Sequence, residues 1–269
     1  MTPSPFIIVS APRCGSTAFY RALNLLPGIR IDYEPAFDDI AFDETGVTSR
    51  VQELLTGYCG FKHVFDPTGF PFRPDHQATI SEMEQHRSLW IRLNAIILNY
   101  PRLRVIFLRR RNGFQRIVSD LVGRATNLWG HTGCSISATE AANYKDAVSQ
   151  VPLPPLDEDL VMWYLEHLPR IEEELRNSIT TNAVLDLWYE DLFGPTIGTA
   201  SRIVRFQQVL QFLQIEAPEG QLQSPELSYI LQPSAKLNDE SIFSRITNYR
   251  ELSNKAAVLY RIAAKTGLC

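Results

Sequence analysis

Short runs of apolar residues alternate along the chain with longer segments in which apolar residues recur every three to four positions. The short runs predict strands buried on both faces of a sheet. Their ranges are Phe6–Val9, Ile29–Tyr33, Gly60–Phe65, Arg104–Leu108 and Ala183–Tyr189. The longer segments predict helices, at Ser16–Leu26, Ile80–Asn99, Asn112–Arg124, Glu158–Ser178, Thr196–Leu213 and Ile242–Thr266. Strands that alternate with helices predict an α/β fold, a three-layer sandwich with a central parallel sheet.

Two segments lack a clear period. Residues 126–155 are long enough to form a cover or a substrate-binding insert, and residues 218–237 are rich in proline and polar side chains. No repeat is evident, and a chain of 269 residues is within reach of one domain, so we expect a single domain over residues 1–269.

The composition is that of an ordinary globular protein, with 45% hydrophobic and 21% charged residues. A net charge of -4 argues against a protein that binds nucleic acids or membrane surfaces through general electrostatic attraction. The basic residues are mostly arginine, whose planar fork suits phosphate groups. Seven arginines lie between residues 102 and 124, where Asp120 is the only acid. This local excess predicts a pocket for a small polyanion.

Four cysteines are widely spaced and lack the pairing typical of metal sites. In a chain of this length they favour free thiols in a reducing compartment. The apolar start, Phe6–Val9, is too short for a membrane span or a secretory leader. We therefore expect a cytoplasmic protein without an anchor.

A turn that contains proline and glycine, Ser10–Thr17, joins the first predicted strand to the first predicted helix. Helix starts attract anions because their first backbone N–H groups are unpaired. Gly15 permits close approach of a phosphate, and Ser16, Thr17 and Arg13 add donors and charge. The segment resembles the phosphate loop of P-loop NTPases, but no lysine follows Gly15. Taken alone, it is interpreted equally well as an ordinary turn capped by Ser16.

A second candidate phosphate site follows the strand Arg104–Leu108. A magnesium-dependent NTPase would need an acid there, whereas this strand runs into arginines. Arg111 and Ser119 are eight residues apart, which places Ser119 two helical turns beyond the arginine. Basic charge is unfavourable at a helix start unless an anion is present. A solvated basic helix start is the alternative interpretation.

Three motifs in this order are similar to those of sulfotransferases that use 3′-phosphoadenosine 5′-phosphosulfate (PAPS). They are Pro12-Arg-Cys-Gly-Ser-Thr17, Arg111-Asn112 with Ser119, and Tyr189-Glu-Asp-Leu192. The chain resembles the bacterial carbohydrate (trehalose-type) enzymes more than the mammalian cytosolic group. The similarity covers residues 6–192 and extends weakly to Lys236.

The resemblance implies PAPS as co-substrate, 3′,5′-diphosphoadenosine as product, and no metal. The 5′-phosphosulfate would be held by Arg13, Cys14, Gly15, Ser16 and Thr17. Cys14 stands where serine is usual, so backbone N–H groups would carry that contact. Arg111 and Ser119 would hold the 3′-phosphate, Tyr189 would lie near the adenine, and Lys236 would close over the nucleotide.

Sulfuryl transfer needs positioned charge and a base that takes the proton of the acceptor. Arg13 is the candidate for stabilising the transferred group, with Lys62 as a second cation. Glu34 resembles the glutamate base of the trehalose-type enzymes; a surface carboxylate is its alternative interpretation. His63 is the rival base, although a lone histidine is more often structural. Trp129 is the tryptophan to test for acceptor binding.

The sequence therefore favours a sulfotransferase acting on a hydroxyl of a carbohydrate or small metabolite. A P-loop nucleotide kinase is one alternative, which the missing lysine opposes. A nucleotide-binding module without catalysis is the other. No nucleic-acid or membrane partner is expected, a homodimer is compatible with the bacterial resemblance, and the sequence does not name the acceptor.

Overall fold

The computed structural model describes residues 4–35, 43–66, 79–128, 138–218, 220–232 and 240–266. The chain divides into two compact units. The first comprises Met1–Arg111 and Arg170–Pro233, and the second comprises Asn112–Pro169 and Ser234–Cys269. The single sulfotransferase domain over residues 1–269 stays a prediction.

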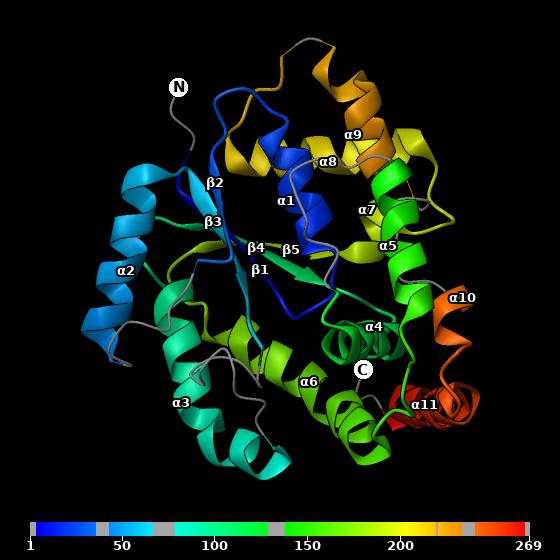
Figure 1. The fold of residues 1–269 in the computed structure, drawn as a ribbon. Coiled ribbons are helices and arrows are strands. Elements are labelled where there is room, and N and C mark those ends of the chain that lie inside the picture. The colour runs from blue at the N-terminus through cyan, green and yellow to red at the C-terminus, as the bar shows by residue number, and fades with distance from the viewer. Residues whose placement is uncertain are drawn as a thin grey trace. The chain divides into compact units, whose positions relative to one another are not determined.

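A parallel five-stranded sheet forms the centre of the first unit, in the order β2-β3-β1-β4-β5 (Figure 1). The strands are β1 (Phe6–Ser10), β2 (Ile31–Tyr33), β3 (Gly60–Val64), β4 (Arg104–Arg109) and β5 (Ala183–Trp188). Each lies where an apolar run predicts a strand. The central strand β1 is buried over its whole length, between β3 and β4.

Helices flank this sheet (Figure 1). The first unit holds α1 (Ser16–Asn24), α2 (Glu44–Gly57), α3 (Ile80–Leu98), α7 (Tyr189–Phe193), α8 (Thr199–Leu213), the 3₁₀ turn η1 (Gln221–Gln223) and α9 (Pro225–Ile230). On one face α1 packs on α8, with the rings of Phe19 and Phe206 6.3 Å apart. On the other, Trp90 of α3 lies 5.9 Å from Phe65, directly after β3. The predicted α/β fold with a central parallel sheet is confirmed.

Some helices lie where the sequence shows no clear period. Helix α2 follows an acidic stretch and buries Val47, Val51 and Leu54, with Asp43 as N-cap accepting from the Gly46 amide at 2.7 Å. Helix α5 (Ala138–Gln150) forms within the segment 126–155. Two elements also differ from the prediction. Tyr189 begins α7 instead of ending a strand. The last predicted helix is divided into two helices, α10 (Glu240–Phe243) and α11 (Tyr249–Thr266).

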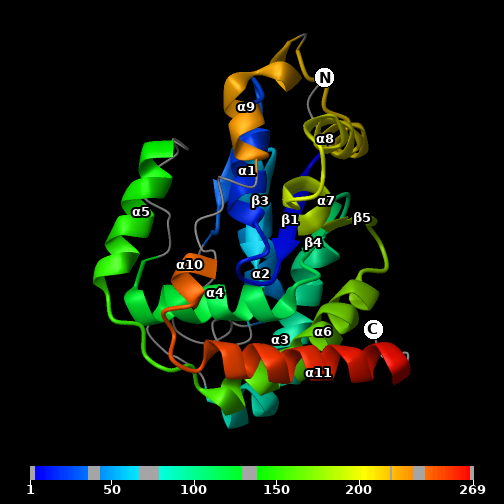
Figure 2. The same ribbon diagram turned by 90° about the vertical axis from the view of Figure 1, so that its right-hand side faces the viewer.

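The second unit contains α4 (Gly113–Thr126), α5, α10, α11 and the start of α6 (Glu158–Ser178), which crosses into the first unit after Pro169 (Figure 2). Helix α11 packs along α4. The ring of Tyr249 lies 5.5 Å from Phe114, and the Tyr260 hydroxyl accepts from the Phe114 amide at 2.9 Å. Arg245, two residues after α10, donates to three carbonyls at and just beyond the end of α5, at distances of 2.8 to 3.0 Å, and so links these two parts of the unit.

Candidate phosphate-loop site

The loop between β1 and α1 has two residues in the left-handed region, Arg13 at φ 62° and Gly15 at φ 83°. A non-glycine residue is uncommon there, and such strain gathers at functional sites. Helix α1 begins at Ser16 with Gly15 as N-cap, so no side chain among the described residues caps its first amides. The hydroxyl of Ser10, at the end of β1, is buried without a partner in the same part of the chain. The first turn of α1, which no side chain of the described residues caps, is therefore a place where backbone N–H groups can bind an anion.

Beside the loop, four side chains from three elements form a polar cluster on the α1 face of the sheet. The Lys62 ammonium, on β3, donates to the Thr17 hydroxyl at 3.0 Å and pairs with the Glu34 carboxylate. It also lies 4.2 Å above the centre of the Tyr33 ring. The hydroxyls of Tyr33 and Thr17 are 3.2 Å apart. This Lys62 cluster links the end of β2 and the middle of β3 to the first turn of α1.

Burial and charge set the protonation of the cluster. Lys62 is 1% exposed, and burial lowers the pKa of its amine from 10.5 to about 8, although the Glu34 carboxylate opposes this shift. Burial, with Glu34, raises the pKa of the Tyr33 phenol well above its usual range, so the phenol keeps its proton. Arg13 and Arg21 bear electrostatically on both groups. In the cluster, the Glu34 carboxylate thus lies close to the Lys62 ammonium, and the charges of Arg13 and Arg21 act on the same groups.

Glu34 lies at the accessible end of the cluster. Its side chain is 38% exposed, and its backbone is left-handed at φ 48° directly after β2. A carboxylate that is held by a buried cation yet reached by solvent can accept a proton from a bound group.

His63 lies on the other face of the sheet, because successive residues of a strand point to opposite faces. Its ring is buried against α3, with Nε2 2.7 Å from Oδ1 of Asn94. The Asn94 amide nitrogen in turn donates to the Trp90 carbonyl at 2.8 Å. Burial lowers the pKa of His63, and the hydrogen bond to Asn94 only partly opposes the shift. The structure does not bring His63 to the Lys62 cluster.

The three consecutive arginines at the end of β4 and directly after it point in different directions, and Arg110 points to the loop. Its guanidinium donates to the Arg13 carbonyl at 3.1 Å and lies 4.7 Å above the Tyr189 ring. That ring covers Gly15: a Cβ on Gly15 would lie 2.5 Å from the Tyr189 Cδ2 atom. Tyr189 is partly buried, and desolvation raises the pKa of its phenol, against the effect of Arg110.

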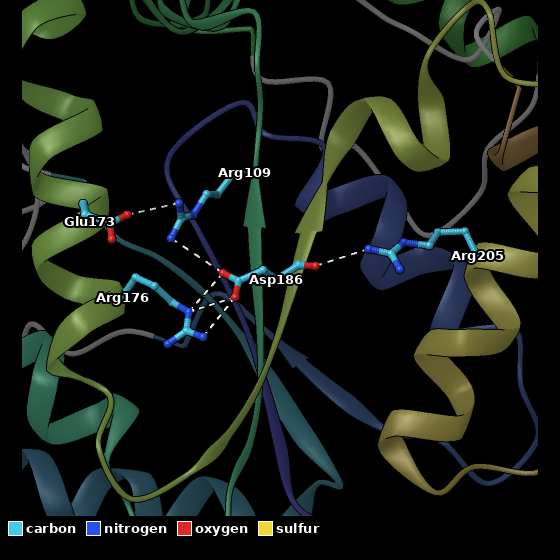
Figure 3. A network of polar contacts seen from close by, with 5 residues as sticks. All are labelled: Arg109, Glu173, Arg176, Asp186 and Arg205. Carbon is cyan, nitrogen blue, oxygen red and sulfur yellow. Dashed lines mark hydrogen bonds and ion pairs between the residues drawn. The ribbon is translucent and has the colours of Figure 1, made fainter. Parts of the chain in front are cut away.

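Arg109 and Arg111 belong instead to ion pairs around β5, as Figure 3 shows for Arg109. Arg109 lies 3.6 Å from the Asp186 carboxylate, which Arg176 binds through two nitrogens at 3.0 Å. Arg111 is 51% exposed and pairs with Asp191 at 2.9 Å. The structure thus places Arg111 against the carboxylates of Glu190 and Asp191 in α7, directly after the edge strand β5.

The two members of the predicted 3′-phosphate site fall in different units. Arg111 ends the first part of the first unit, and Ser119 lies in α4 of the second, where it is buried. Their closure on one phosphate stays a prediction. Cys14, Ser16 and Tyr189 lie in or against the loop. Lys236 and Trp129 lie outside the described residues.

Sequence reasoning left Tyr33 and Arg110 without individual roles. Both could have been found from strand alternation. Tyr33 is opposite Lys62 in the register of β2 and β3, so the two side chains share a face. Arg110 follows Leu108 by two residues, and Leu108 is opposite Ser10 of β1, on the face of α1.

Comparison with protein-family models, with curated proteins and with solved structures finds no match. Among the described residues, no group of three or more His, Cys, Asp or Glu side chains could hold a metal ion. In the same ranges, no helix has both the length and the apolar character needed to cross a membrane.

Proposed function

We propose that the protein transfers a sulfuryl group from PAPS to a hydroxyl of a carbohydrate or small-metabolite acceptor. The observation that carries the proposal is the contact between the Lys62 cluster and the phosphate loop. Lys62 binds both Thr17, in the first turn of α1, and Glu34, at the accessible end of the cluster. A phosphate loop and a candidate base are therefore joined through one cation.

The donor would lie with its 5′-phosphosulfate on the first turn of α1, where unpaired amides and the helix dipole favour an anion. The residues that would bind it are Ser16 and Thr17 in this turn and Arg13, Cys14 and Gly15 in the loop before it. Arg111 and Ser119 would hold the 3′-phosphate, which distinguishes PAPS from ATP. Tyr189 would lie near the adenine, and Lys236 would close over the nucleotide.

The reaction is an in-line displacement. The acceptor oxygen forms a bond to sulfur, the bond from sulfur to the 5′-phosphate oxygen breaks, and that oxygen keeps the electron pair. The acceptor proton passes to the Glu34 carboxylate. Arg13 and Lys62 stabilise the charge on the sulfuryl and leaving oxygens, so the proposed mechanism uses no metal. His63, the rival base of the sequence analysis, is buried against α3 on the other face of the sheet, so the proposed mechanism gives it no role.

Calorimetric titration tests the donor class. We expect 3′,5′-diphosphoadenosine to bind more tightly than ATP with magnesium, and Arg111→Ala to remove most of that preference. A preference for ATP with magnesium would contradict the proposal and favour a nucleotide kinase. Tight binding of 3′,5′-diphosphoadenosine without turnover of any acceptor would favour a binding module.

Glu34→Gln tests the base. The variant keeps the side-chain shape and a hydrogen-bond acceptor for Lys62, so we expect unchanged affinity for 3′,5′-diphosphoadenosine. Turnover should fall by about a hundredfold or more, as is usual when a general base is removed. Normal turnover would contradict the assignment of Glu34 as the base.

A further inference from the structure

The ends of β1 and β4 lie side by side in the sheet, and side chains at the end of β4 and just beyond it alternate between the faces of the sheet. Arg109 and Arg111 are held by the carboxylates of Asp186 and Asp191. Arg110, between them, is buried and directed to the phosphate loop. Neighbours in the sequence therefore make different contacts.

Arg110 touches the loop at its most strained point. It donates to the carbonyl of Arg13, the non-glycine residue that the loop holds at φ 62°. An unsupported residue in this region relaxes to a lower-energy backbone, because the left-handed conformation is unfavourable for a side chain with a Cβ. A charged donor on the carbonyl opposes that relaxation.

The same guanidinium also holds the cover of the loop. It lies 4.7 Å above the Tyr189 ring, whose other neighbours include Phe193 at 5.2 Å and the Gly15 backbone. Arg110 therefore fixes the residues on both sides of Cys14: Arg13 through its carbonyl and Gly15 through the ring that covers it.

We propose that Arg110 is a positioning residue for the phosphate loop, which it holds in the anion-binding conformation for every 5′-phosphate ligand. The inference deepens the proposed function and rests on it for the identity of the natural ligand. It assigns different tasks to adjacent arginines. Arg110 acts through the loop, whatever the nucleotide carries at its 3′ position, whereas Arg111 acts only on a 3′-phosphate.

Two nucleotides separate these tasks by calorimetry: adenosine 5′-monophosphate, with a free 3′-hydroxyl, and 3′,5′-diphosphoadenosine. Arg110→Lys keeps the charge but loses the planar fork, and Arg110→Gln removes the charge. We expect both variants to weaken both nucleotides at least about tenfold, in equal proportion. Arg111→Ala should weaken only 3′,5′-diphosphoadenosine. Arg92→Ala, an exposed arginine on α3, is the control and should change neither affinity.

Amide hydrogen exchange of the peptide that spans Ser10–Thr17 separates positioning from general stability. In Arg110→Lys we expect faster exchange in this peptide and unchanged protection in β3 and α3. Equal affinity of Arg110→Lys and the wild type for adenosine 5′-monophosphate would overturn the inference, as would loss confined to 3′,5′-diphosphoadenosine. If the wild type prefers ATP with magnesium, the sulfotransferase proposal fails and ATP replaces the two nucleotides in the same comparison. A wild type that binds no 5′-phosphate nucleotide overturns both proposals.

Discussion

Replacing Gly15 by alanine adds a methyl group where the ring of Tyr189 already lies. The new Cβ would be 2.5 Å from Cδ2 and 2.8 Å from Cε2 of that ring, far inside the contact distance of two carbons. The ring has little freedom to withdraw, because it packs against Phe193 and lies beneath Arg110. The substitution also forces a residue with a Cβ to remain at φ 83°.

The two effects add to a large loss of stability. A left-handed backbone costs a non-glycine residue about 1–2 kcal/mol, and overpacking a buried contact costs about 1–3 kcal/mol. We therefore expect Gly15→Ala to lower the free energy of unfolding by about 2–5 kcal/mol. Gly28→Ala is the matched control. Gly28 has φ 79° but no neighbour within 4 Å of an added Cβ, so it should lose only the backbone part.

Urea unfolding, followed by tryptophan fluorescence, measures these losses in a double-mutant cycle. In a Tyr189→Ala background the methyl group has room, and the further loss from Gly15→Ala should fall to that of Gly28→Ala. The coupling energy between positions 15 and 189 should be about 1–3 kcal/mol. Additive losses, or equal losses for Gly15→Ala and Gly28→Ala in the wild-type background, would refute the packing of Tyr189 on Gly15.

Three further predictions concern the Lys62 cluster, the buried histidine and the second unit. Activity, measured as kcat/KM, should fall about tenfold per pH unit above pH 8, where Lys62 loses its proton. Lys62→Arg should abolish that fall, because arginine stays charged. Identical pH profiles of kcat/KM for the wild type and Lys62→Arg would contradict the role of Lys62. His63→Phe should keep turnover within about twofold but destabilise the protein by about 1–3 kcal/mol, because Asn94 loses its donor. Because the pKa of His63 is lowered in the folded state, that state binds fewer protons than the unfolded state below pH 6.5. The free energy of unfolding of the wild type should therefore fall as the pH drops below 6.5, and it should fall more than that of His63→Phe. Arg245→Ala should cost about 1 kcal/mol in urea unfolding, through the loss of its carbonyl contacts at the end of α5; an unchanged midpoint would contradict it.

The sheet was predictable because its central strands β1 and β4 are short apolar runs, and such runs are buried on both faces of a parallel sheet. The phosphate loop was predictable because proline and glycine interrupt the chain directly after Val9. Helices α2 and α5 were missed, since their apolar residues are sparse and tertiary contacts decide their formation.

Which side chains meet at the site was harder to predict than where the loop lies. Lys62 and His63 are adjacent in the sequence, yet strand alternation sends them to opposite faces, toward Thr17 and Asn94 respectively. The position of Arg111 between Trp188 and Asp191 depends on a strand that lies far away in the sequence. Motif spacing carries no information about such a partner.

Transfer of label from radiolabelled PAPS tests the central claim most directly. Wild-type protein and the Glu34→Gln variant would be incubated with the donor and a panel of carbohydrates and small hydroxyl-bearing metabolites. We predict labelled product with at least one acceptor for the wild type, and about a hundredfold less with Glu34→Gln at equal donor affinity. Equal transfer by the two proteins would contradict the assigned base. Binding of PAPS without transfer to any hydroxyl would contradict the claim that this site moves a sulfuryl group.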